Sequence, residues 1–300
     1  MLFRSAVALL HRRKHLPPFV AAFLLLAGDI HPNPGPPPSA FHVFSLNTRS
    51  LLHPDRPTQI FDIVDSHHPD LICLTETWIT PDTSSSCLIN LTPPGYSLFS
   101  CPSSINKSSS RTLGGGTAFL TREPYTALSH SSPCYSSFDV FSITLKLLSS
   151  KLSVYNIYRC PSSSIHSGKL SVFFEQFQHF LASAATTPHE FLITGDFNFH
   201  VDDPDDSASI QFLSILSSFN LSQHVSCSTH DKGHTLDLVI CSANSTLHPS
   251  ITVHPTSPSD HFPLSIHLNI SPLPLPPPKL LTFRNYRSLD RKSTRLNSSH

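Results

Sequence analysis

Five short parts of this chain join an apolar run to polar side chains that can act on a phosphate ester. They are residues 44–49, 71–78, 155–159, 191–198, and the pair 234–237 with 259–261. The apolar runs have the composition of buried strands, so the polar residues that follow should meet at one edge of a sheet. Each part alone carries little weight, because a carboxylate after a strand is usually solvated and a single histidine is usually structural.

The residue types in these parts match the requirements of phosphodiester cleavage. The reaction needs a cation to neutralise the phosphate, an activated water and stabilisation of the leaving oxygen. Mg²⁺ prefers oxygen ligands and keeps several waters, so Glu76 is the leading ligand candidate, with Asn47 and Asp260 beside it. His261 needs a partner that fixes its tautomer and raises its pKa, and Asp237 can supply that carboxylate.

The order of these residues along the chain is also informative. The succession is Asn47, Glu76-Thr77-Trp78, Tyr158-Arg159, Gly195-Asp196-Phe197-Asn198, Leu236-Asp237 and Ser259-Asp260-His261. It resembles the endonuclease/exonuclease/phosphatase superfamily, which includes pancreatic-type DNases and apurinic endonucleases. The resemblance covers residues 40–270, which we expect to form the catalytic domain. It implies a four-layer α/β sandwich, in which two packed mixed β-sheets are flanked by helices.

The resemblance also implies an activity and a role for each residue. The domain would be a phosphodiesterase that depends on Mg²⁺, with Mn²⁺ as the alternative cofactor, and DNA would be its substrate. Asp196 would orient or deprotonate the attacking water, Asn198 would contact the phosphate, and Tyr158 would hydrogen-bond a phosphate or leaving oxygen. Arg159 and Arg49 would add positive charge to the phosphate site.

One departure from the repair enzymes indicates a branch of the superfamily. Apurinic endonucleases place an acid two residues after the first Asn, where this chain has Arg49. Asn-x-Arg-Ser-Leu is the form found in non-LTR (LINE-type) retrotransposons, as are Glu-Thr-Trp, Tyr-Arg-x-Pro and Gly-His-Thr-Leu-Asp. The leading hypothesis is therefore an endonuclease that nicks target DNA to prime reverse transcription, with a reverse transcriptase domain downstream in the native protein.

Two other functions remain open on the sequence alone. One is a secreted or host DNase or phosphatase of the same superfamily, and the other is an inactive retrotransposon-derived binding module. Intact site residues argue against the inactive module. The run from Asp202 to Asp206 could in principle be a second metal site, but we interpret it as a loop whose last acids favour a helix N-terminus.

Apolar runs and helical spacing alternate along the domain and favour an α/β layered fold. Strands are expected at 41–46, 70–75, 116–120, 138–147, 151–158, 190–195, 236–241 and 262–268. Helices are expected at 58–66, 169–184 and 208–220. Ser- and Pro-rich stretches at 83–86, 102–112, 129–137 and 161–168 are expected to be surface loops.

The first 36 residues differ from the domain. An apolar run from Phe19 to Ala27 is too short to cross a bilayer, so no stable membrane association is expected. The ending that follows resembles ribosome-skipping peptides of the 2A type at Asp29, Asn33, Pro34, Gly35 and Pro36, although His31 replaces their usual Glu. With a skipping leader the protein would act inside the cell, in the nucleus. If residues 1–27 are instead a signal peptide, it would be secreted.

After the domain, residues 271–289 read as a stiff proline-rich linker. Residues 290–300 resemble a sequencing-library adapter translated in one frame, so we interpret them as an artefact and expect a different native continuation.

Composition limits how the domain can bind a partner. The whole chain has a formal net charge of zero, but basic residues gather in 1–36 and 290–300, which leaves the domain mildly acidic. Contact with DNA must therefore come from a few local basic groups and a metal. The seven cysteines are scattered without a CxxC pair, which argues against a zinc site, and Cys73 and Cys241 are expected to be buried.

Overall fold

The computed structural model describes residues 40–104, 114–161, 169–257 and 259–274. The expected skipping motif, signal peptide and adapter-like end all lie outside these residues, as does most of the proline-rich linker. Within the described part of the chain, no helix is long and apolar enough to cross a membrane.

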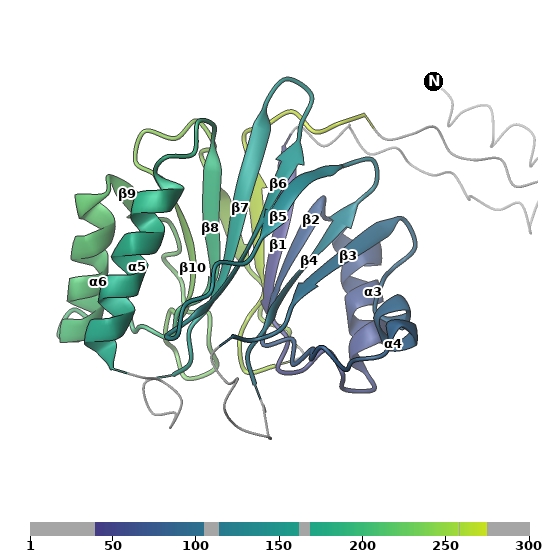
Figure 1. The fold of residues 1–300 in the computed structure, drawn as a ribbon, viewed down its shortest axis with the longest axis horizontal. Coiled ribbons are helices and arrows are strands. Elements are labelled where there is room, and N and C mark those ends of the chain that lie inside the picture. The colour runs from purple at the N-terminus through teal and green to yellow at the C-terminus, as the bar shows by residue number, and fades with distance from the viewer. Residues whose placement is uncertain (1–39, 105–113, 162–168, 258, 275–300) are drawn as a thin grey trace, which may run out of the picture. The chain divides into compact units, whose positions relative to one another are not determined.

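Two six-stranded sheets form the centre of the domain (Figure 1). The first sheet has the order β11 (Ser250–Val253), β12 (Leu264–Leu268), β1 (Phe41–Asn47), β2 (Leu71–Thr75), β4 (Thr117–Arg122) and β3 (Tyr96–Cys101). The second has the order β5 (Ala127–Ser131), β6 (Asp139–Lys146), β7 (Lys151–Tyr158), β8 (Phe191–Asp196), β10 (Asp237–Ser242) and β9 (Leu221–Gln223).

Helices cover the outer face of each sheet, which gives four layers and confirms the predicted α/β sandwich (Figure 1). On the first sheet lie α3 (Arg56–His67) and α4 (Ser85–Asn90), and on the second lie α5 (Leu170–Ala184) and α6 (Ser207–Ser218). Each sheet has one parallel pair, β1 with β2 and β7 with β8, and α3 and α5 make the two crossovers. Parallel strands end at the same edge, so each pair presents its following residues together.

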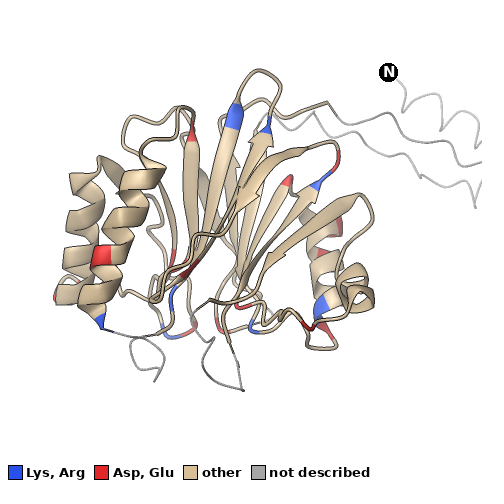
Figure 2. Ribbon diagram, viewed as in Figure 1, with Lys and Arg blue, Asp and Glu red and all other residues tan. Residues whose placement is uncertain are grey.

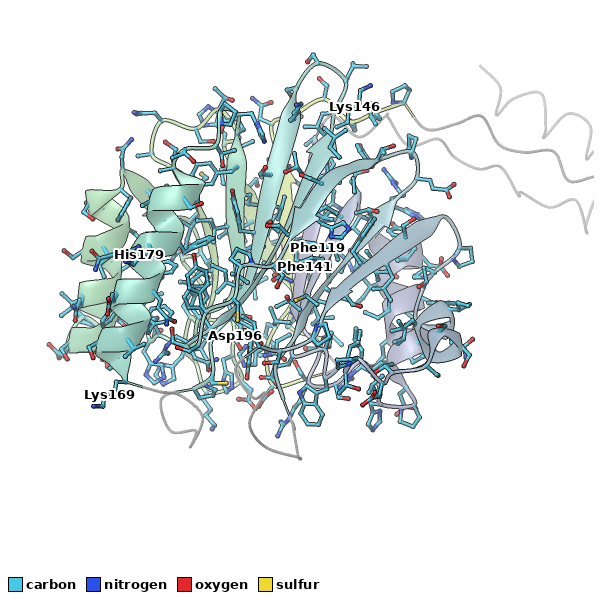
Figure 3. All side chains as sticks on the ribbon, viewed as in Figure 1. Phe119, Phe141, Lys146, Lys169, His179 and Asp196 are labelled. Carbon is cyan, nitrogen blue, oxygen red and sulfur yellow. The ribbon has the colours of Figure 1, made fainter. Side chains whose placement is uncertain are left out.

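The central strands are buried on both faces, which explains their continuous apolar runs. In β1, Phe41 and Val43 pack between the two sheets, whereas Phe44 and Leu46 pack against the helix layer of the first sheet. Phe119 and Phe141 meet in the middle of the sandwich, with ring centroids 5.3 Å apart (Figure 3). Cys73 and Cys241 are buried as predicted.

The eight expected strands and three expected helices are all present, with small shifts at their ends. Four strands and a short helix were not expected: β3, β5, β9, β11 and α4. The four strands occupy the outermost positions of the two sheets. The prediction of loops at 83–86 and 129–137 was wrong in part, because α4 begins at Ser85 and β5 continues to Ser131.

Polar contacts join the two sheets inside the sandwich. The side-chain amide of Asn156 on β7 donates to the carbonyls of Leu74 (2.8 Å) and Ala118 (3.2 Å) in the first sheet. The Thr194 hydroxyl on β8 donates to the Ser45 hydroxyl on β1 at 3.3 Å. Buried hydrogen bonds of this kind have directional preferences that apolar packing lacks, so they hold the sheets in register near the ends of β1, β2, β7 and β8.

Gly195 allows β7 and β8 to approach each other directly before Asp196. It has a φ of +132°, and a Cβ built on it would lie 2.0 Å from the carbonyl oxygen of Ile157. We expect Gly195→Ala to lower the free energy of unfolding by about 3 kcal/mol or more, because backbone must move. Gly233→Ala is the matched control: its φ is +90°, but no atom lies within 4 Å of the added Cβ, so about 1 kcal/mol is expected. Chemical denaturation of both variants measures the difference, and equal losses would contradict this account of Gly195.

Candidate active site

The side chain of Asn47, the last residue of β1, links the two sheets at the site. Its side-chain amide donates to Asp196 Oδ2 (2.9 Å) at the end of β8 and to Glu76 Oε1 (3.1 Å) after β2. Asp196 lies at the lower end of the second sheet in Figure 3. Three predicted site residues from distant parts of the sequence are therefore in direct contact.

The backbone around Glu76 is held in an unusual conformation. Glu76 and Trp78 have φ values of 50° and 55°, in the left-handed region that costs most non-glycine residues energy. The Thr48 hydroxyl stabilises this turn by donating to the carbonyls of Thr75 (2.9 Å) and Glu76 (3.1 Å). The turn places the Glu76 carboxylate within hydrogen-bond distance of the Asn47 amide.

Asp196 is fully buried beside other charged groups. Burial raises the pKa of its carboxyl, and the nearby carboxylates of Asp237 and Glu76 raise it further. His261 and the hydrogen bond from Asn47 act in the opposite direction. A carboxyl group with a raised pKa, held beside a histidine, is suited to accepting a proton.

His261 and Asp237 form the hydrogen-bonded pair that the sequence predicted. His261 Nδ1 lies 2.8 Å from Asp237 Oδ2, and His261 Nε2 lies 3.8 Å from Asp196 Oδ2. Burial lowers the pKa of His261, but the carboxylates of Asp237 and Asp196 outweigh it and the net shift is upward. The Thr229 hydroxyl accepts the backbone N–H of Asp237 at 3.0 Å and helps to fix the pair.

Asp260 and Arg49 lie at the exposed rim of the same site. Arg49 donates to Asp260 Oδ2 at 3.1 Å, and the Arg49 side chain is 61% exposed. The neighbouring Ser259 hydroxyl donates to the Asn47 carbonyl at 2.8 Å, which links the segment before β12 to the end of β1. The predicted metal ligands Asn47, Glu76 and Asp260 are thus gathered at one edge.

Tyr158 and Asn198 complete the floor of the site. Tyr158 is buried, and burial together with Glu76 raises the pKa of its phenol well above the usual range. It therefore stays protonated and can donate a hydrogen bond. Asn198 has a φ of 52°, its backbone N–H donates to Asp196 Oδ1 (3.1 Å), and its side-chain amide donates to the Arg159 carbonyl (2.7 Å).

Arg159 is buried against the loop that follows Asp196. Its side chain is 1% exposed, and its guanidinium donates to the carbonyls of Phe197 and Asn198, both at 3.1 Å. The guanidinium also lies over the ring of Phe199, 4.1 Å from the centroid, and burial lowers its pKa to about 10. Arg159 therefore stabilises the loop after Asp196, and its expected contact with phosphate stays a prediction.

The acidic run from Asp202 to Asp206 and the nearby His234 lie beside the site. Asp206 caps α6 by accepting from the backbone N–H groups of Ala208 and Ser209, and Asp202 accepts from Thr235 N at 2.7 Å. The interpretation of this run as a helix-capping loop is thus confirmed. His234 stacks on His200 with ring centroids 3.9 Å apart.

Two residues that the sequence analysis missed support the site. His230 forms a backbone bridge with His261, and the two rings meet edge to face at 4.8 Å. Asp139 at the start of β6 accepts the backbone N–H of Gly116 (2.9 Å) and of Ser104 (2.8 Å). Neither residue follows an apolar run with a polar cluster, so the pattern used to find the other residues could not find these.

The side chains at this edge fit a divalent cation. The carboxylates of Glu76, Asp196 and Asp260 form an oxygen-rich donor set, which suits Mg²⁺. Asn47, whose amide nitrogen donates to two of them, offers Oδ1 as a further oxygen. Burial and the neighbouring carboxylates of Asp237 and Glu76 raise the pKa of Asp196, and a bound cation would offset both effects. Among the described residues, one group that could hold a metal consists of Asp196, Asp237 and His261.

Comparison with protein families places this site in a known group. The model of the Endonuclease/Exonuclease/phosphatase family matches residues 44–261, which contain the whole site. The chain belongs to this family. Its members are phosphodiesterases and phosphatases that typically depend on a divalent metal, so a hydrolase is the activity class of the fold and site. A comparison with curated protein sequences found no match.

Solved structures share the fold at low sequence identity. An AP endonuclease from Leishmania major superposes with a TM-score of 0.61 at 17% identity, covering 77% of this chain and 88% of its own. The endonuclease domain of TRAS1, a telomere-specific non-LTR retrotransposon, gives 0.56 at 13% identity, covering 77% and 99%. A mannosyl-6-phosphatase from Bacteroides thetaiotaomicron gives 0.54 at 15%, covering 76% and 99%. Proteins with this fold therefore act on several classes of substrate. The substrate of this chain must be inferred from the side chains of its site.

The two arginines of the site should differ in their contribution to stability. We expect Arg159→Met to lower the free energy of unfolding by about 2–4 kcal/mol, because it leaves buried carbonyls without donors. Arg49→Met should change it by no more than about 0.5 kcal/mol, since Arg49 is exposed. Denaturant unfolding followed by circular dichroism gives both values. A stable Arg159→Met protein would show that these contacts of Arg159 are dispensable.

Proposed function

We propose that this chain contains the endonuclease of a non-LTR retrotransposon, which nicks one DNA strand and leaves a 3′-hydroxyl that primes reverse transcription. The observation that carries the proposal is the contact network from Glu76 through Asn47 and Asp196 to His261 and Asp237. This network holds the groups that phosphodiester hydrolysis requires. The retrotransposon role is supported by the Asn-x-Arg-Ser-Leu form around Arg49 and by the likeness in fold to the TRAS1 endonuclease domain.

The residues divide the chemistry between the two sheets. Glu76, Asn47 and Asp260 would hold Mg²⁺, which when bound neutralises phosphate charge and polarises the bond to be broken. Asp196 orients the attacking water and accepts its proton, because burial gives its carboxyl an increased proton affinity. His261, kept cationic by Asp237, stabilises the charge that develops on the phosphate.

Charge distribution favours DNA contact at this edge over the outer face of the second sheet. Helices α5 and α6, which form the outer face of the second sheet, contain a single charged residue between them, Glu175 (Figure 2). A face with so few cations cannot attract a phosphate backbone. Arg49 is exposed at the rim of the site, where it can position a phosphate beside Asp260.

This function has implications for location and partners. The enzyme would act on chromosomal DNA in the nucleus, together with a reverse transcriptase domain of the native protein. The 2A-like ending at residues 29–36 would then separate the leader from the enzyme during translation.

The full chain should nick supercoiled plasmid in Mg²⁺ and lose that activity with a chelator. Glu76→Ala, Asp196→Asn and His261→Ala should each lower the rate about 100-fold or more, because each removes a distinct contribution to one transition state. The losses in double variants should not add. Arg49→Ala should raise KM for DNA more than it lowers kcat. Gel separation of nicked and supercoiled plasmid gives the rates.

The outcome that would refute the DNA assignment is specific. A folded protein that leaves plasmid intact but hydrolyses phosphoinositides or sphingomyelin in Mg²⁺ would retain the family chemistry and exclude the endonuclease. No hydrolysis of any phosphate ester would favour the binding module instead.

Translation of the chain in a eukaryotic lysate should give two products divided between Gly35 and Pro36. The reason is the Asn33-Pro34-Gly35-Pro36 ending behind an apolar run, the pattern of skipping peptides. Electrophoresis of labelled products measures the ratio, and Pro36→Ala should convert them to one band. If the unchanged chain gives one full-length band, the skipping hypothesis fails and the signal-peptide reading gains support.

A further inference from the structure

Two histidines at the rim of the site share an arrangement that metal-binding histidines commonly have. His261 Nδ1 lies 2.8 Å from the Asp237 carboxylate, and His230 Nδ1 lies 3.0 Å from the Asp231 carboxylate. A carboxylate on Nδ1 orients an imidazole and leaves Nε2 available for a metal. The proposed hydrolysis uses His261 but gives no role to His230.

The available nitrogens lie close to a shared carboxylate. One ligand atom from each of His230, Asp260 and His261 lies within 4.8 Å of the other two. His230 Nε2 is 3.8 Å from Asp260 Oδ2. The backbone bridge between His230 and His261 fixes their separation, and both side chains are buried. Two segments about thirty residues apart therefore bring together the imidazoles of His230 and His261 and the carboxylate of Asp260.

The donor set of this cluster differs from that of the proposed Mg²⁺ ligands. Two imidazole nitrogens and one carboxylate suit Zn²⁺ and similar borderline metals, whereas Mg²⁺ prefers an all-oxygen set. We propose that His230, Asp260 and His261 form a second cation site, selective for a nitrogen-preferring divalent metal of the Zn²⁺ class, whose occupation opposes the phosphodiesterase reaction. This inhibition rests on the proposed function, because a metal bound to Asp260 and His261 would prevent them from holding Mg²⁺ and stabilising the phosphate.

Two neighbouring groups adjust when such a metal binds. The backbone N–H of Lys232 donates to His230 Nδ1 at 3.1 Å, which places the ring proton on Nε2. A metal on Nε2 displaces that proton to Nδ1, which then donates it to Asp231, and the Lys232 N–H must give up its contact with Nδ1. Arg49 holds Asp260 Oδ2 at 3.1 Å and must release it. Arg49 therefore competes with the metal for the same oxygen.

Metal titration of the full chain tests the site without reference to activity. The protein is stripped with a chelator and titrated in millimolar Mg²⁺ with Co²⁺, followed by visible absorption, and with Zn²⁺ in competition with a chromophoric chelator. We expect His230→Gln to weaken Zn²⁺ affinity at least tenfold and to remove the Co²⁺ bands. Asp231→Asn, which changes an exposed carboxylate and leaves the fold intact, should weaken it about tenfold. Arg49→Ala should strengthen it.

His179→Gln is the matched control, since His179 is an exposed histidine on α5 (Figure 3). Zn²⁺ affinity equal to that of the unchanged chain in both His230→Gln and Asp231→Asn would overturn the proposal. A parallel assay measures Zn²⁺ inhibition of plasmid nicking relative to each variant's own Mg²⁺ rate, and His230→Gln should require at least tenfold more Zn²⁺. Unaltered inhibition in His230→Gln would refute the regulatory part. Failure of the proposed endonuclease would appear as no nicking in any sample while the Co²⁺ spectra still respond to His230→Gln.

Discussion

The arrangement of the whole site depends on one buried carboxylate, that of Asp196. A carboxylate removed from water is stable only if donors and positive charge surround it. The amide of Asn47 comes from the first sheet, the backbone N–H of Asn198 from the loop after β8, and His261 from the segment before β12. Each of these must be in place together, so the register between the sheets is set by the same contacts that prepare the chemistry.

The parts of this fold that follow from burial were predictable from the residues. Strands such as β1 and β2 are covered on both faces and have continuous apolar sequences, so their existence and end points could be inferred. The four unexpected strands lie at the sheet edges, where residues such as those of β5 are mostly exposed. An exposed edge strand needs no apolar pattern, because its hydrogen bonds to one neighbour are enough to form it.

Some features of the site could likewise be predicted from the sequence, and others could not. Asn47, Glu76, Asp196, Asp237 and His261 were predicted together, and the structure places them in one network. Arg159 was assigned to phosphate by the resemblance, and residue type does not reveal which face of the loop its side chain occupies. Phe173 and Phe199 offer it an aromatic pocket that only packing reveals. His230 was missed for the opposite reason, since nothing local marks it and its partner lies far along the sequence.

The order in which strands enter the sheets has a consequence for biosynthesis. The first sheet begins with β1 to β4, the whole second sheet follows, and the chain then returns to place β12 beside β1. A nascent chain therefore emerges with its first strand paired only to β2, and β1 lacks its second neighbour until about residue 268 has left the ribosome. Asp260 and His261 directly precede that last strand, so a prematurely released chain would lack the closing strand and these site residues together. Shortened products of translation are thereby harmless to any phosphate ester that the finished domain cleaves.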